Sequence, residues 1–244
     1  MTTFKTRGLV LREYEAGESD KRLLILCKIH GRIMAYARGA RNPRSKFIAA
    51  SQLFTYADFV LAQGRGFFSV TQAEVIENFY NLRTDYDRLI AAHLLVEVCE
   101  KTLLENSNCD ELLLLALRAL SNLSKGVFPP TQITSVFLMR FFDFYGLKPN
   151  ISNCIICNHP TQEMSDGIYL GAEGIVCATH KAQEKTAALM PISKAAARAI
   201  THIFHSGMAQ SFLFNTNQNV LRELERASNL LWDTHFEWGL KSRS

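Results

Sequence analysis

Four residues in the second half of the sequence have the types and the spacing of metal ligands. Cys154 and Cys157 form a Cys-x2-Cys pair, and Cys177 and His180 form a Cys-x2-His pair after a gap of 19 residues. Thiolate sulfur and imidazole nitrogen are preferred ligands of tetrahedral Zn²⁺, and a two-residue gap lets one turn direct both side chains of a pair at one ion. Because four protein ligands fill the coordination sphere, we expect a structural zinc site.

Alternative interpretations of this motif are weaker. His159 lies two residues after Cys157 and competes with His180 as fourth ligand, but His180 completes the second pair symmetrically. An iron–sulfur cluster held by four cysteines would need one more cysteine within the motif. A catalytic zinc would need an open coordination position and a general base, and the sequence has no HExxH element to supply them. The motif therefore explains how a region is held together and leaves the function open.

A second chemical signal is the positive charge of the N-terminal third. Residues 1–80 contain 12 lysines and arginines against 7 acids, whereas the remainder contains 15 against 16. From Lys28 to Arg65 there are seven basic residues and one acid, Asp58. A cationic surface of this kind attracts a polyanion, and nucleic acid is the first candidate. The cations with this expected role are Arg32, Arg38, Arg41, Arg44, Lys46 and Arg65.

Aromatic residues are interleaved with these cations. Single-stranded nucleic acid is held by cations that follow its phosphates and by rings that stack on its bases. Several of the rings must instead fill a core, so the residues alone leave a merely solvated basic surface as an equal alternative. The rings concerned are Tyr36, Phe47, Phe54, Tyr56, Phe59, Phe67 and Phe68.

The elements that position the cations have the pattern of strands. Five β-branched or aromatic runs with partial alternation lie within residues 4–77, and short connections with glycine, such as Gln63 to Gly66, separate some of them. Five short strands in this length predict a small closed barrel, and the oligonucleotide-binding (OB) fold is the best match, although strand number alone leaves other five-stranded barrels open. The segment from Gly39 to Ala50 is expected to be a solvent-exposed loop.

Beyond Asn78 the hydrophobic period changes to that of helices. We predict helices over residues 82–105, 110–123, 131–145, 193–205 and 220–238, with Thr84 as the first N-cap. The zinc hairpin occupies residues 150–181. The predicted fold class is therefore α+β, with an OB domain at 1–80, a helical domain at 81–149 and 182–244, and a zinc hairpin inserted in it. In the first helix, one face is expected to carry Leu89, Leu94, Val96, Cys99, Leu103 and Leu104.

The composition excludes several classes of protein. No apolar run is long enough to cross a bilayer and the start of the chain has no secretory core, so we expect no membrane association and a cytoplasmic, nucleoid-associated location. Three cysteines outside the metal motif lie scattered in apolar segments, which is not a disulfide framework. No phosphate-binding loop or dinucleotide turn is present.

Nearly the whole chain resembles the bacterial recombination mediator family RecO. The resemblance rests on the run Thr6 to Arg12, on Ala37-Arg38-Gly39-Ala40-Arg41, and on residues 137–157, which are similar to the helix that leads RecO chains into their zinc region. Many zinc-bearing members have cysteine at the position of His180, and some members lack the metal. The resemblance therefore does not make zinc the functional centre.

The resemblance implies a function that is not enzymatic. RecO-like proteins bind single- and double-stranded DNA and anneal complementary strands. With RecR they help load RecA onto DNA coated by the single-stranded DNA-binding protein. Carried onto this chain, the family's basic OB surface falls on the six cations named above, which would neutralise phosphates.

Two rival functions follow from the metal motif. A zinc-dependent hydrolase or nuclease requires an open metal position. A sequence-specific zinc transcription factor requires a basic zinc module that enters a groove, whereas residues 150–180 contain three acids and neither lysine nor arginine.

Overall fold

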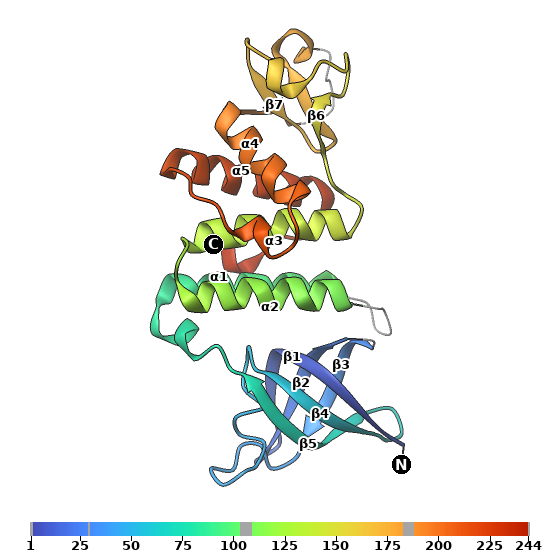
Figure 1. Cartoon of the computed structure of the whole chain (residues 1–244). Coiled ribbons are helices and arrows are strands. Elements are labelled where there is room, and N and C mark those ends of the chain that lie inside the picture. Colours follow the sequence, from blue (N-terminus) through green and yellow to red (C-terminus); the bar gives the residue numbers. More distant parts are fainter. Residues whose placement is uncertain (1, 29, 103–108, 183–187, 244) are drawn as a thin grey trace. The chain divides into compact units, whose positions relative to one another are not determined.

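Two compact units make up the chain. The structure, a computed structural model, describes residues 2–28, 30–102, 109–182 and 188–243. Unit 1 comprises Met1–Val127 with Ser242–Ser244, and unit 2 comprises Phe128–Lys241 (Figure 1). No helix within these described ranges has the length and apolar character needed to cross a membrane. These units report only which parts of the chain are compact. The domain boundaries expected from the sequence therefore stay a prediction.

The N-terminal strands of unit 1 close into a barrel in the order β1-β2-β3-β5-β4. Within the described barrel strands, β3 and β5 pair in parallel, through Ala35 with Phe68 and Tyr36 with Ser69, and the other neighbours are antiparallel. This closed five-stranded barrel, followed by helices, confirms the predicted fold class and has the strand number of the OB fold. The strands are β1 (Thr3–Ala16), β2 (Asp20–Cys27), β3 (Gly31–Ala37), β4 (Tyr56–Gln63) and β5 (Phe68–Glu77).

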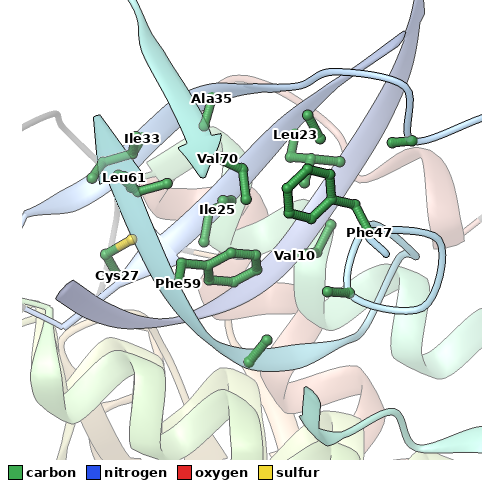
Figure 2. Packing of buried hydrophobic residues seen from close by; sticks show 14 residues of the cluster. Val10, Leu23, Ile25, Cys27, Ile33, Ala35, Phe47, Phe59, Leu61 and Val70 are labelled. Carbon is green, nitrogen blue, oxygen red and sulfur yellow. The ribbon is translucent and has the colours of Figure 1, made fainter. Parts of the chain in front are cut away.

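Strand alternation fills the barrel with small and branched apolar side chains (Figure 2). Successive residues of a strand point to opposite faces, so every second residue reaches the interior. The segment between β3 and β4 contributes Ala40, Phe47 and Ala50 to the same core. Residues 39–50, expected to be a solvent-exposed loop, instead form a series of turns with one buried apolar side. These apolar side chains fill the end of the barrel, which is too small to be closed by its strands alone.

The outer side of β1 and β2 is covered by two helices, α1 (Tyr86–Thr102) and α2 (Asp110–Lys125). Four leucines that alternate away from the barrel core are at most 5% exposed: Leu9, Leu11, Leu24 and Leu26. Glu100 of α1 also ties the helix to the barrel, because its carboxylate lies 2.6 Å from Arg12 Nη2.

The prediction for α1 was wrong in two respects. The helix begins at Tyr86, and its N-cap is Asp85, whose Oδ1 accepts a hydrogen bond from the Arg88 N–H at 3.0 Å. Thr84 instead ends a 3-10 helix, η1 (Tyr80–Thr84), that precedes the extended Asp85. Residues 94–99 are all buried, so α1 is covered on more than one face. The predicted positions 103–105 lie outside the described residues.

Unit 2 contains three helices that pack on one another: α3 (Pro130–Phe144), α4 (Lys194–His205) and α5 (Gln218–His235). Their core is aromatic, with the fully buried Trp232 ring 4.4 Å from Phe236 and 5.8 Å from Phe141. As predicted, Gly146 follows α3 in a left-handed conformation, with φ of 72°. Ser193 caps α4 by accepting a hydrogen bond from the Ala196 N–H.

The predicted zinc hairpin is a four-stranded sheet in the order β6-β8-β7-β9. It comprises β6 (Asn150–Cys154), β7 (Ile168–Leu170), β8 (Gly174–Cys177) and β9 (Met190–Ile192). The prediction ended at residue 181 and missed β9. This strand has only three residues, and it pairs with β7 although it lies beyond the metal motif in the sequence. Short 3-10 helices, η2 (Thr161–Glu163) and η3 (Ala178–His180), lie between the strands.

One carboxylate fixes the start of the segment after β3. Asp20 Oδ1 accepts a hydrogen bond from the Gly39 N–H at 2.8 Å, and Gly39 adopts φ of 67°. We expect Asp20→Ala to lower the free energy of unfolding by about 1–3 kcal/mol, because the loss of a charged acceptor leaves a half-buried N–H without its partner. Denaturant unfolding measures the change, and limited proteolysis reports loosening of residues 38–55.

Glu18→Ala is the matched control for this prediction. Glu18 lies in the β1–β2 turn two residues before Asp20, is exposed and carries the same charge. Equal effects of the two substitutions would show that charge, and not the hydrogen bond to Gly39, is responsible.

Candidate nucleic-acid interface and metal centre

The outer face of β3 carries a row of polar and apolar side chains in the barrel unit. Ile33, Ala35 and Ala37 point into the core, so alternation turns Arg32, Met34 and Tyr36 outward. Met34 is 36% exposed and Tyr36 is half-buried. Arg38 follows directly after the strand and is exposed.

Five of the six predicted cations are exposed, and three of these five have no side-chain partner in the part of the chain that the structure describes. Among the described residues, Arg38, Arg44 and Arg65 have neither an ion pair nor a hydrogen bond through their side chains. Arg38 and Arg44 belong to the segment that closes the barrel, and Arg65 belongs to the β4–β5 hairpin. A guanidinium without a protein partner keeps its five donors for phosphate oxygens.

The other three predicted cations already contact the protein. Arg32 Nη1 donates to the Glu100 carbonyl at 2.9 Å, which directs this side chain toward α1. Arg41 donates to the Gly17 carbonyl at 3.1 Å and lies 3.2 Å from a Glu15 carboxylate oxygen. Lys46 Nζ donates to the Thr71 carbonyl at 3.2 Å. These contacts order the basic surface, and they leave part of each cation's hydrogen-bonding capacity unused.

The predicted aromatic residues separate into core and surface groups. Phe47, Phe54 and Phe59 are at most 7% exposed and are structural. Phe68 packs against the barrel core. Phe67 is 40% exposed and meets Tyr36 edge to face, with a ring separation of 5.8 Å. Exposed ring surface therefore accompanies the outer row of β3.

Sequence reasoning missed one cation beside this row. Arg22 of β2 is exposed, is the register partner of Tyr36, and lies over the Tyr14 ring at 5.7 Å. It is separated from the other cations in the sequence, so charge density alone does not select it. The short His30-Gly31 connection, which indicates a hairpin between these two strands, was the signal that could have placed it there.

Some other N-terminal cations form ion pairs with nearby acids. Arg7 lies 3.0 Å from Asp58, and Lys28 lies 3.3 Å from Asp110. Asp58, through a hydrogen bond and its charge, raises the pKa of Arg7 above its usual value. Within the described barrel strands and their connections, exposed arginines without an acidic partner therefore lie on β2, in the segment after β3 and in the β4–β5 hairpin.

The four predicted metal ligands come together in unit 2. Cys154 ends β6, Cys177 ends β8 and His180 ends η3, while Cys157 lies in the turn after β6. Their three Sγ atoms and one imidazole nitrogen all lie within 4.8 Å of one another, and this group can hold a metal ion. The Sγ atoms of Cys157 and Cys177 are 3.9 Å apart. A tetrahedral zinc with Zn–S bonds of ~2.3 Å sets sulfurs ~3.8 Å apart, so the spacing fits.

The turn after β6 shapes the metal site. The Cys154 N–H donates to the His159 carbonyl at 2.8 Å, and the Asn158 N–H donates to the Cys154 carbonyl at 2.9 Å. Asn158 takes a left-handed conformation with φ of 60°, which asparagine tolerates well. Burial opposes ionisation of Cys154, but backbone N–H groups of Cys157, Cys177 and Ile156 outweigh it and lower the pKa of this thiol to about 7.

The structure brings His180, and not His159, into the group of ligands. The Nδ1 atom of His180 lies 3.1 Å from Cys177 Sγ. His159 is exposed and contributes its backbone carbonyl to the turn. The donor set is therefore three sulfurs and one nitrogen.

Comparisons with known proteins match both parts of the chain. Residues 1–79 match the family described as Recombination protein O N terminal, and residues 83–244 match Recombination protein O C terminal. The chain is 36% identical over 228 residues to the DNA repair protein RecO of Acetivibrio thermocellus, covering 93% of this chain and 90% of that one. It is 24% identical over 239 residues to the DNA repair protein RecO of Bacillus mycoides, covering 98% and 94%.

The barrel with its exposed cations, the helices and the cysteine–histidine group thus define a DNA-binding protein of repair and recombination. The chain belongs to the Recombination protein O (RecO) family.

The ligand assignment predicts different effects for the two histidines. We expect His180→Ala to lower the bound zinc well below one ion per chain and to destabilise unit 2 by roughly 4 kcal/mol, because loss of a structural metal is among the most damaging single changes. Elemental analysis of the purified protein and thermal unfolding measure the two effects.

His159→Ala is the control for this prediction, since His159 is close in sequence and exposed. It should keep the zinc content and the unfolding temperature of the parent protein. Loss of zinc from this variant, with zinc retained after His180→Ala, would reverse the assignment.

Proposed function

We propose that this protein is a recombination mediator that binds single- and double-stranded DNA on the outer surface of its barrel. In this proposal it anneals complementary strands and, with RecR, helps load RecA onto DNA coated by the single-stranded DNA-binding protein. Membership of the RecO family supports the repair and recombination role. The single observation that carries the DNA-binding surface is the set of exposed, unpaired arginines Arg38, Arg44 and Arg65 within the described part of the barrel unit.

Annealing follows from phosphate neutralisation. Two complementary strands repel each other through their phosphates, and bound guanidinium groups screen this repulsion. Contacts with phosphates leave the base edges free, so Watson–Crick pairing proceeds without sequence preference. The process needs no bond cleavage and no nucleotide hydrolysis, which supports a role that is not enzymatic.

The proposed roles of the six cations differ. Arg38, Arg44 and Arg65 bind phosphates directly, whereas Arg32, Arg41 and Lys46 also order the surface through Glu100, Gly17 and Thr71. RecR, the single-stranded DNA-binding protein and, indirectly, RecA remain proposed partners. Work on DNA places the protein with the nucleoid in the cytoplasm in this proposal.

The proposed metal is a structural Zn²⁺ held by Cys154, Cys157, Cys177 and His180. Three sulfurs and a nitrogen suit zinc, and four protein ligands leave no open position for water or substrate. When bound, zinc would brace β6, β8 and η3 against one another. The closed ligand set disfavours a zinc-dependent hydrolase or nuclease, which would need a free position on the metal.

The proposed DNA surface predicts a change in salt dependence. Replacement of Arg38, Arg44 and Arg65 by alanine should weaken single-strand binding at least tenfold at moderate salt and lower the slope of log K against log salt by roughly 2, because three phosphate contacts are lost at ~0.7 each. Strand annealing should slow in parallel. Fluorescence anisotropy at several salt concentrations and an annealing assay measure both effects.

A variant with the same charge change elsewhere is the control. Arg118, Lys125 and Arg222 are exposed cations outside the barrel strands and their connections, and replacing them by alanine should leave the salt slope unchanged. If both variants lost affinity equally, net charge would account for binding. An unchanged slope in the barrel variant would contradict the proposed surface.

A further inference from the structure

The hairpin between β4 and β5 holds an apolar ring in solvent. Phe67 is 40% exposed and is the only phenylalanine among the exposed large apolar residues of the described chain. Its neighbour Phe68 packs against the barrel core. Of these two adjacent rings, Phe68 is therefore packed and Phe67 remains on the surface. Protein stability gives no reason for an exposed ring at this position.

The Phe67 ring is held in place although it is exposed. The Gly64 N–H donates to the Phe67 carbonyl at 2.8 Å and closes the hairpin. A Cβ atom at Gly64 would lie 3.1 Å from Phe67 Cζ, so the ring lies against the glycine backbone. Tyr36 contacts the ring edge to face, at 5.8 Å and an interplanar angle of 80°. A ring fixed in this way loses little conformational entropy when a ligand binds.

Charged and apolar neighbours extend this surface along the strand. Met34 is exposed on the same outer face of β3 as Tyr36. Arg65 precedes Phe67 by two residues, Arg38 follows Tyr36 by two, and both are exposed. The stretch of β3 from Met34 to Ala37 with Arg38 spans on the order of 13 Å, since a strand rises ~3.3 Å per residue. Exposed rings accompanied by cations are the means by which proteins hold unpaired nucleotides.

We propose that Phe67 stacks on a base of single-stranded DNA, with Tyr36 as the positioning residue behind it and with Arg65 and Arg38 on the flanking phosphates. This inference rests on the proposed function and adds a selective contact to it. The faces of bases are available in a single strand and are covered by neighbouring bases in a duplex. The arginines therefore serve both forms of DNA, whereas Phe67 serves the single strand alone. The ring makes the barrel prefer unpaired DNA.

The test compares both forms of DNA with the full-length protein. Phe67→Ala should raise the Kd for a single-stranded oligonucleotide by about 5- to 150-fold, which is the effect of losing one stacked base. The Kd for a duplex of the same length should stay the same, and so should the salt slope for the single strand. A 2-aminopurine base in the oligonucleotide should show the stacking directly, as a fluorescence change on binding that this variant loses.

Three further variants distinguish base stacking from a general apolar contact. Phe67→Trp should retain single-strand affinity, because tryptophan keeps a flat aromatic face, whereas Phe67→Leu should lose it. Tyr80→Ala is the matched control, because Tyr80 is 65% exposed and belongs to η1, outside the β4–β5 hairpin. This control should bind both DNA forms normally. Unchanged thermal unfolding of each variant shows that the barrel is intact.

Several outcomes would overturn the stacking site. The first is an unchanged single-strand affinity in Phe67→Ala, and the second is an equal loss of affinity for single strand and duplex. The third is full single-strand affinity in Phe67→Leu, which would indicate an apolar contact such as a protein partner. If the variant lacking Arg38, Arg44 and Arg65 lost its salt slope while Phe67→Ala bound normally, the stacking site would be wrong and the proposed DNA surface would stand.

Discussion

Closure of a small apolar barrel is the constraint on which the N-terminal part of the structure depends. The interior accepts only every second residue of each strand, so the outward residues are free to differ in character. On β1 and β2 the outward leucines are buried and α1 and α2 pack on these strands. On β3 the outward row ends in exposed residues instead. The same alternation thus builds the core, the surface against the helices and the exposed surface that we propose binds DNA.

The segment after β3 contributes both to the barrel core and to the proposed DNA surface. Its apolar side completes the barrel core through Phe47, while its polar side carries Arg44. Contacts from Asp20 and Arg41 to neighbouring backbone hold the start of the segment near the β1–β2 turn. A surface that must bind phosphates without sequence preference needs cations in fixed positions, and these contacts supply that order. The family's role in repair and recombination fits such a surface.

Much of this arrangement was predictable from local sequence. Strand alternation and turn residues predicted the barrel, and the paired spacing of Cys154, Cys157, Cys177 and His180 predicted which side chains meet. Short-range patterns failed where distant packing decides the outcome. Residues 94–99 are buried on several faces of α1, which a one-sided periodicity does not describe. Phe67 and Phe68 are chemically identical, and only the barrel geometry separates the exposed ring from the packed one. The pairing of β9 with β7 likewise joins residues 20 to 24 positions apart in the sequence, which short-range patterns do not reveal.

The most direct test of the central claim is photochemical cross-linking of the full-length protein to single-stranded DNA, followed by mass spectrometry of the cross-linked peptides. If the barrel surface binds DNA, cross-links should concentrate in two stretches, residues 32–46 and 63–69, and should disappear when salt is raised enough to release the strand. Cross-links concentrated within Phe128–Lys241, with the barrel peptides unmodified, would contradict the account.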